Sequence, residues 1–393
     1  MRTKPLIIAA FAALTLVAAA CGSDDESTST SAAAESTAPQ ESTAPEETTA
    51  PEETTAPDET TAPDDTTGST LDLDSNGDGK VVFGIAAAGP RDDGGYYQAL
   101  VDKAITISSD NGFEEPIVVD NITTEDAATE LANLAEQNVD VILVGASEIA
   151  DPLTDLIDQY PDIFWYCNCG AGYPENPGLA QSQDDSSEIS YTAGYATGLL
   201  MQAAGGESAA FIGCCDLNFE KEAYLAYELG LQAVDPAYTM TYIPTGGFPF
   251  DFDNTAGATE ALNGAITNGA DAVYPYLGGA HEPLVKIANE EGIITMSAGS
   301  SSACERTDLD YQIQVRFDGG DYIDTIFNEI VAGTFSEGDI RVFRVGIDPE
   351  PGAEICDPTP EQQAAMDDVY AQIAAGDFAE QFGAIKGQAY SGG

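Results

Sequence analysis

Histidine is almost absent from this sequence. The 393 residues include one histidine, His281, and one tryptophan, Trp165. A single histidine excludes most acid–base and metal-hydrolase mechanisms, because such sites need several of these side chains. The chain also has no Gly-x-Ser-x-Gly elbow and no Gly-Lys-Ser phosphate loop. We therefore expect a binding protein rather than an enzyme, without a catalytic residue, metal or cofactor.

Positive charge is scarce as well. The chain has 12 lysines and arginines against 68 aspartates and glutamates, which gives a net charge of −56. About 16 of the acids precede Val81, so the remainder of the chain is itself strongly acidic. Nucleic acids and anionic lipid surfaces attract basic proteins, and this composition excludes both as direct partners. We interpret the excess acid as a solubility trait; recognition of a cationic ligand is the alternative.

The first 20 residues are typical of a signal peptide. Arg2 and Lys4 precede an apolar run from Leu6 to Ala20, which is shorter than the roughly 20 residues of a membrane span. Cys21 follows three alanines and resembles the acylated cysteine of a bacterial lipobox, with Ala18 where leucine is usual. We expect a lipid on Cys21 that anchors the protein to the outer face of the cytoplasmic membrane. An ordinary secretory signal is the alternative.

Residues 21–79 have the composition of a linker. Nearly all of them up to residue 69 are Ser, Thr, Ala, Pro, Glu or Asp, and residues 36–65 contain five hexads of one pattern. Such a segment has little apolar surface to bury, and its acids repel one another. We expect it to be an extended tether between the lipid and the folded body, with a passive remnant as the alternative.

The chain from residue 80 onward alternates strands with helices. The first series has predicted strands at 81–85, 116–120, 139–144 and 163–166, and predicted helices at 96–108, 125–137 and 149–160. The second has predicted strands at 209–213, 239–243, 272–276 and 293–296, and predicted helices at 220–234, 259–268 and 282–291.

Continuous apolar strands separated by helices indicate parallel sheets covered on both faces. We therefore predict an α/β protein with two doubly wound lobes. Residues 80–205 would form mainly the first lobe and residues 206–393 mainly the second, with crossover segments near 297–335. In open parallel sheets a ligand binds beyond the carboxyl ends of the strands, which places the site in the cleft between the lobes.

Several motifs occur in the order that a known family has. They are Asp93-Gly94-Gly95-Tyr96-Tyr97, Gly247-Phe248, Asp253, Gly269-Ala270-Asp271 and Gly278-Gly279-Ala280. From Val81 to Phe378 the chain resembles the basic membrane protein family, the solute-binding lipoproteins of ABC importers related to purine-nucleoside receptors. The resemblance implies a type I periplasmic-binding-protein fold that closes on a small polar ligand, favouring a nucleoside, and presents it to a permease and ATPase.

The resemblance leaves alternatives open. One alternative is a sugar receptor or a signalling receptor of the same fold. Another is a thiol oxidoreductase that would use Cys214 and Cys215. The chain departs from the family where the fourth strand ends, since Asn168 stands near an expected aspartate. A second aspartate of the family is missing from residues 297–300. Arg316 stands where the family has a lysine, and its planar guanidinium group is suited to a carboxylate or phosphate. We expect the protein to be a monomer.

The candidate ligand-binding residues lie at predicted strand ends or within the family motifs. They are Asp93, Tyr96, Tyr97, Phe248, Asp253, Gly278, Gly279, His281 and Arg316. An aromatic ring at a strand end can stack on a ring, sugar or base, and a carboxylate can accept from a ligand hydroxyl.

Each candidate has a structural alternative. Asp93 could cap the following helix, and one of the two tyrosines is expected in the core. The phenylalanines at 248, 250 and 252 could pack within their own loop, and His281 could face solvent. We expect Trp165 in the core.

Six cysteines follow Cys21, and they favour disulfides in an exported protein. Two pairs stand at strand ends, Cys167 with Cys169 and Cys214 with Cys215, and Cys304 and Cys356 remain. The full pairing stays open, although bridges within one rim would leave the cleft free to close. A metal site is the alternative, but the spacing does not match Cys-x2-Cys. Residues 72–78 begin like a calcium loop whose twelfth position is Phe83, so we interpret them as a polar turn, with calcium as the alternative.

Overall fold

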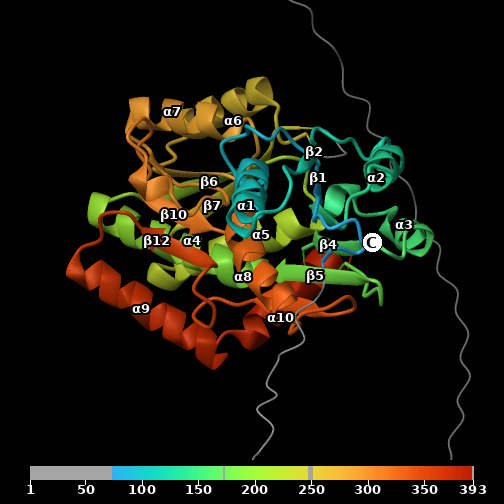
Figure 1. Cartoon of the computed structure of the whole chain (residues 1–393). Coiled ribbons are helices and arrows are strands. Elements are labelled where there is room, and N and C mark those ends of the chain that lie inside the picture. The colour runs from blue at the N-terminus through green and yellow to red at the C-terminus, as the bar shows by residue number, and fades with distance from the viewer. Residues whose placement is uncertain (1–72, 171–172, 247–250, 392–393) are drawn as a thin grey trace, which may run out of the picture. The chain divides into compact units, whose positions relative to one another are not determined.

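The computed structural model describes residues 73–170, 173–246 and 251–391 (Figure 1). The predicted lipidation site Cys21, most of the tether, Asp72, Phe248 and Phe250 lie outside these ranges. Within them, no helix is both long and apolar enough to span a membrane.

The first lobe contains a six-stranded sheet in which all neighbouring strands are parallel, in the order β11-β5-β4-β3-β1-β2. The strands are β1 (Phe83–Ala87), β2 (Ile117–Val119), β3 (Val141–Gly145), β4 (Phe164–Asn168), β5 (Leu179–Asp184) and β11 (Ile340–Phe343). The helices are α1 (Tyr96–Asn111), α2 (Ala127–Ala135), α3 (Leu153–Gln159) and α8 (Gly319–Val331), with a 3-10 turn at Ser147–Ile149.

Helices cover both faces of this sheet because successive side chains of a strand point to opposite sides. Ile142 and Val144 of β3 pack in the cluster formed with α2 and α3. Val141 and Leu143 of the same strand pack in the cluster formed with α1 and α8. Trp165 of β4 is fully buried, which confirms its predicted core position.

The second lobe contains a four-stranded parallel sheet in the order β7-β6-β8-β9, and an antiparallel pair, β10 with β12. The strands are β6 (Ser208–Gly213), β7 (Thr239–Pro244), β8 (Ala272–Pro275), β9 (Ile294–Thr295), β10 (Ile313–Arg316) and β12 (Gly352–Ile355). The helices are α4 (Ser186–Ala204), α5 (Asn218–Val234), α6 (Thr255–Thr267), α7 (His281–Glu291), α9 (Pro360–Ala375) and α10 (Ala379–Tyr390), with a 3-10 turn at Ala303–Glu305.

The chain passes between the lobes in three places within the described residues. The first is Asp185, between β5 and α4; the second is Phe317 and Asp318, between β10 and α8; the third is Arg344, after β11. Figure 1 accordingly shows α8 in the middle of the molecule, with β4 and β5 to one side and β10 and β12 to the other. The two parallel-sheet lobes confirm the predicted α/β fold class.

Charged groups hold the crossings together. Arg344 donates from Nε to Glu188 Oε1 at 2.8 Å, and Glu188 Oε2 accepts from the backbone N–H of Val345 at 3.0 Å. Lys386 of α10 donates to Asp185 Oδ2 at 2.6 Å. Residues from the first crossing, the third crossing and the C-terminal helix therefore meet in one ionic network.

Helices α4 and α5 pack backbone against backbone. A Cβ on Gly194 of α4 would overlap the carbonyl oxygen of Tyr227, and a Cβ on Gly230 of α5 would overlap that of Tyr191. Only glycine leaves room for this approach, because these carbonyls belong to the helices themselves and cannot move aside.

The variant Gly194→Ala tests this packing. Its methyl group would force α4 and α5 apart, and we expect the free energy of unfolding to fall by about 1 to 3 kcal/mol in urea titrations. Gly264→Ala in α6 is the matched control, since nothing lies within 4 Å of that Cβ. Alanine favours a helix over glycine, so the control should gain up to about 1 kcal/mol. Equal changes in both variants would contradict the close contact.

Candidate functional site

A pocket of about 190 Å³ lies between the lobes, where strands of both sheets end. The first lobe contributes residues that follow β1, β3 and β4, together with Asp184 at the end of β5. The second contributes Phe219 of α5, Phe252, and the segment from Tyr276 to His281 that enters α7. This is the position that the parallel topology predicts for a ligand.

Asp93 organises the start of α1. Its Oδ1 accepts from the backbone N–H groups of Gly95 at 2.9 Å and Gln98 at 3.0 Å. Burial holds the pKa of Asp93 above its ordinary value although these bonds favour the carboxylate. The side chain both lines the pocket and caps the helix, so its two predicted roles coincide.

Tyr96 and Tyr97 both line the pocket, and neighbouring glycines make room for their rings. A Cβ on Gly319 of α8 would come within 2.9 Å of the Tyr96 ring, and one on Gly89 would overlap the Tyr97 ring. The two rings stand edge to face with centroids 5.4 Å apart. The Tyr96 hydroxyl is buried and has no hydrogen-bond partner within the protein.

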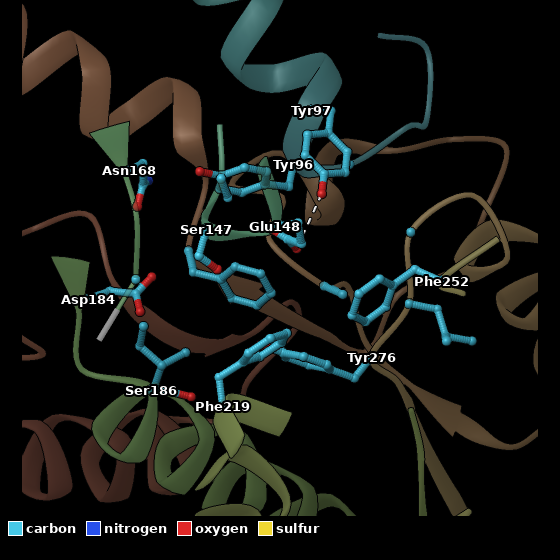
Figure 2. Close-up of a pocket in the computed structure, with 18 of the residues that line it drawn as sticks. Tyr96, Tyr97, Ser147, Glu148, Asn168, Asp184, Ser186, Phe219, Phe252 and Tyr276 are labelled. Atoms are coloured by element: carbon cyan, nitrogen blue, oxygen red, sulfur yellow. Dashed lines mark hydrogen bonds between the residues drawn. The ribbon is translucent and has the colours of Figure 1, made fainter. Parts of the chain in front are cut away.

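Polar groups of the first lobe form one side of the pocket (Figure 2). Glu148, in the 3-10 turn after β3, accepts from the Tyr97 hydroxyl at 3.4 Å through Oε1. Asp184 accepts from the Tyr322 hydroxyl at 3.2 Å. Burial raises the pKa of Glu148, and it raises the pKa of Asp184 to about 7. Asn168, at the end of β4, is 5% exposed, and its Nδ2 has no partner within the protein.

Aromatic rings of the second lobe form the other side. The rings of Phe219 and Phe252 are roughly parallel, with an interplanar angle of 26° and centroids 6.3 Å apart. Tyr276 follows β8, and its ring lies 5.7 Å from that of Phe317 on the second crossing. Figure 2 shows Phe219, Phe252 and Tyr276 facing the same space as Glu148 and Asp184. The site therefore pairs a carboxyl side with an aromatic side.

The turn before α7 is held by a hydrogen bond to a neighbouring loop. Asp253 accepts from the backbone N–H of Gly279 at 2.6 Å, and neither residue lines the pocket, whereas Gly278 does. His281, a predicted ligand-binding candidate, is 6% exposed and lines the pocket, so the alternative of a solvent-facing side chain is wrong. Its Nδ1 contacts the Pro275 carbonyl oxygen at 2.8 Å, and burial lowers its pKa, which favours the neutral ring.

The remaining candidates lie elsewhere. Arg316 does not line the pocket, because β10 carries its side chain to Glu354 of the paired strand, where Nη2 lies 3.0 Å from Oε1. Phe248 is outside the described residues. Phe252, one of the three alternating phenylalanines of that loop, is a pocket residue.

The lobes also touch beside the pocket. Gly94 lies so close to α7 that a Cβ would come within 2.6 Å of Glu282 Oε1, and its φ of 72° suits glycine. A second hollow, of about 790 Å³, shares residues 93–95 with the pocket and is lined by polar groups that include Asp102, Glu282 and Arg306.

The six cysteines after Cys21 form three disulfides in the structure. Cys167 joins Cys169, Cys214 joins Cys215, and Cys304 joins Cys356. The two strand-end pairs each stay within one rim, so neither crosses the cleft. Within the described residues, no group of three or more His, Cys, Asp or Glu side chains is arranged to hold a metal ion.

Sequence reasoning missed several pocket residues. Glu148 follows the predicted strand at 139–144, and Tyr276 ends the predicted strand at 272–276, so the rule that ligands bind at strand ends could have found both. Asp184 ends a strand whose polar sequence gave no signal. Tyr390 reaches the pocket from the last turn of the C-terminal helix, which no local pattern indicates.

The raised pKa of Asp184 predicts that the stability of the folded state depends on pH. The folded state keeps the proton up to about pH 7, whereas the unfolded chain loses it near the ordinary aspartate pKa of 3.8. Stability from this group therefore falls as pH rises from about 4 to 7. We expect Asp184→Asn to gain stability relative to wild type by on the order of 4 kcal/mol between pH 4 and pH 8, since the shift is about three pKa units. Glu290→Gln, at an exposed carboxyl, controls for the lost charge. A pH-independent difference in urea titrations would contradict the prediction.

One family model matches this chain, and solved structures share its fold. The model of the Bmp family, the PnrA-like ABC transporter substrate-binding proteins, matches residues 80–302. A solved ABC transporter system solute-binding protein from Conexibacter woesei DSM 14684 has a TM-score of 0.57 and 19% identity, covering 76% of this chain and 97% of that one. Among curated protein sequences, none matches this chain.

Two further structures have the same fold. An ABC transporter system solute-binding protein from Aeropyrum pernix K1 has a TM-score of 0.59 at 15% identity, covering 79% of this chain and 92% of that one. A transcriptional activator of the comK gene from Bacillus halodurans has a TM-score of 0.59 at 13% identity, covering 74% and 96%. These likenesses establish the type I periplasmic-binding-protein fold. Because the family model matches more than half of the residues, this chain belongs to the Bmp family of ABC transporter substrate-binding proteins.

Proposed function

We propose that this protein is an extracytoplasmic lipoprotein that captures a small, ring-bearing polar solute, with a nucleoside favoured, and delivers it to an ABC permease and its ATPase. The observation that carries the proposal is the pocket at the strand ends, whose walls come from both lobes. A ligand that touches both walls stabilises the closed form, since only that form provides both sets of contacts. No bond is made or broken.

The aromatic side supports a flat ligand. Phe219 and Phe252 offer nearly parallel rings, and a sugar or base can lie against such a surface. The polar side offers carboxyl oxygens and the unpaired amide of Asn168, which can bond to hydroxyls or ring nitrogens. Sugars alone remain the alternative ligand class, and one panel of solutes distinguishes the two.

Thermal shift of the folded body, from about Ser69 onward, tests the ligand class with nucleosides, bases, sugars and amino acids. We expect adenosine or another nucleoside to raise the melting temperature.

Phe219→Ala should weaken the affinity for the nucleoside about tenfold in calorimetric titrations, because it removes a stacking surface. Phe113→Ala is the control, since that ring packs on Phe83 and Phe327 away from the pocket. A response to sugars alone would replace the ligand class, and no response to any solute would overturn the proposal.

The membrane anchor is tested at Cys21. We expect Cys21→Ser to move the protein from the membrane fraction to the soluble fraction, whereas Ser23→Ala should stay with the membrane. Mass spectrometry of the wild-type protein should find a lipid on the N-terminal cysteine and no free thiol, because we expect the other six cysteines to be paired. A wild-type protein without lipid that remains in the membrane fraction would contradict this anchor.

A further inference from the structure

The pocket has carboxyl groups on one side but no positive charge to balance them. Three of its lining residues are acids, Asp93, Glu148 and Asp184, and none is a lysine or arginine. His281 is the remaining basic residue of the lining, and its burial lowers its pKa and leaves the ring neutral at physiological pH. Any countercharge must therefore come from the ligand.

Basic residues near the pocket are already engaged. Arg344 and Lys386 bind Glu188 and Asp185 at the hinge. Arg316, the basic residue that the family motif suggested for the site, pairs with Glu354. Neutralising the pocket with one of these side chains would require breaking an existing ion pair.

Glu148 has the clearest unmet requirement. Its Oε1 accepts one long hydrogen bond from Tyr97, whereas its Oε2 is buried and has no partner among the described residues. Burial of such an oxygen is costly unless something bonds to it. Asp184 Oδ2 accepts a hydrogen bond from the Tyr322 hydroxyl. The pKa of Asp184 is raised by burial and, in addition, by neighbouring groups of like charge. Both groups would be stabilised as carboxylates by a cation in the pocket.

The opposite side is suited to the same charge. The faces of aromatic rings attract cations, and desolvated sites strengthen that attraction. Phe219, Phe252 and Tyr276 lie across the pocket from the acids (Figure 2), so one positive group can contact carboxyl oxygens and ring faces at once. The acids come from the first lobe and these rings from the second, and a cation between them would draw the lobes together.

We propose that the solute of this protein is a small organic cation, with a protonated or quaternary nitrogen held between Glu148, Asp184 and the aromatic side. The inference rests on the proposed solute capture, and it replaces the favoured neutral nucleoside with a positively charged solute. Asn168 adds a second requirement: its buried Nδ2 has no partner within the protein, so the ligand also carries a hydrogen-bond acceptor such as a hydroxyl or carbonyl oxygen.

Matched pairs of solutes test the charge without changing the shape. Benzamidine, benzamide and benzoate carry positive, zero and negative charge on one ring, and choline has an uncharged isostere in which carbon replaces nitrogen. Calorimetric titration of the folded body at physiological ionic strength should find each cation bound about tenfold or more tightly than its neutral partner. Benzoate should not bind.

Three variants locate the effect. Glu148→Gln and Asp184→Asn keep the side-chain shapes and should each reduce the preference for the cation several-fold. Either one alone suffices if the other does not fold, which circular dichroism and thermal unfolding would establish. Asp110→Asn removes one charge from the exposed last turn of α1 and should leave the preference unchanged.

The outcomes separate this inference from the proposed function. Equal binding of cation and neutral partner, or a nucleoside response without any cation response, would overturn the inference and leave solute capture in place. If the preference for the cation is the same in all three variants, it arises from the acidic surface of the protein, and this result would also overturn the inference. Failure of every solute, including the nucleosides and sugars, would overturn both.

Discussion

The arrangement of the two lobes depends on one ion pair in the hinge, whose carboxylate is buried. Glu188 stands in the first turn of α4, just after the first crossing, and Arg344 is the residue of the third crossing. The glutamate is 1% exposed, and its second oxygen accepts from the backbone N–H of Val345. A carboxylate in such a position is costly without a partner, so the two crossings are tied to each other and not merely adjacent.

The same hinge borders the pocket. Asp184 and Ser186 flank the first crossing residue, Phe317 lies on the second, and all three line the pocket. A solute that contacts them acts on the segments that must bend when the lobes move. In a protein of the Bmp family, capture and closure can therefore be one event, since the contacts that bind the solute also define the closed hinge.

The two lobes contribute different chemistry to the site. Carboxyl and amide groups come from loops after the first-lobe strands, and most of the aromatic surface comes from the second lobe. Either half alone would bind weakly, because a charge without desolvation and a ring without a polar partner each provide little selectivity. The chain's overall acidity has a local counterpart here, where three acids face a pocket whose described lining contains no lysine or arginine.

The sequence by itself determined the doubly wound lobes. Its apolar strands and amphipathic helices recur at local spacing, and the predicted elements agree with β1 to β4 and with β6 to α7 within a few residues, whereas β5 and α4 were not predicted. It also placed Asp93, Tyr96 and Tyr97 at the pocket, because they follow a strand end. Only the tertiary structure decided that α8 and β11 return to the first lobe, that Tyr390 reaches the site, and that Arg316 turns to Glu354. Those outcomes depend on contacts between residues far apart in the chain, and no local periodicity encodes such contacts.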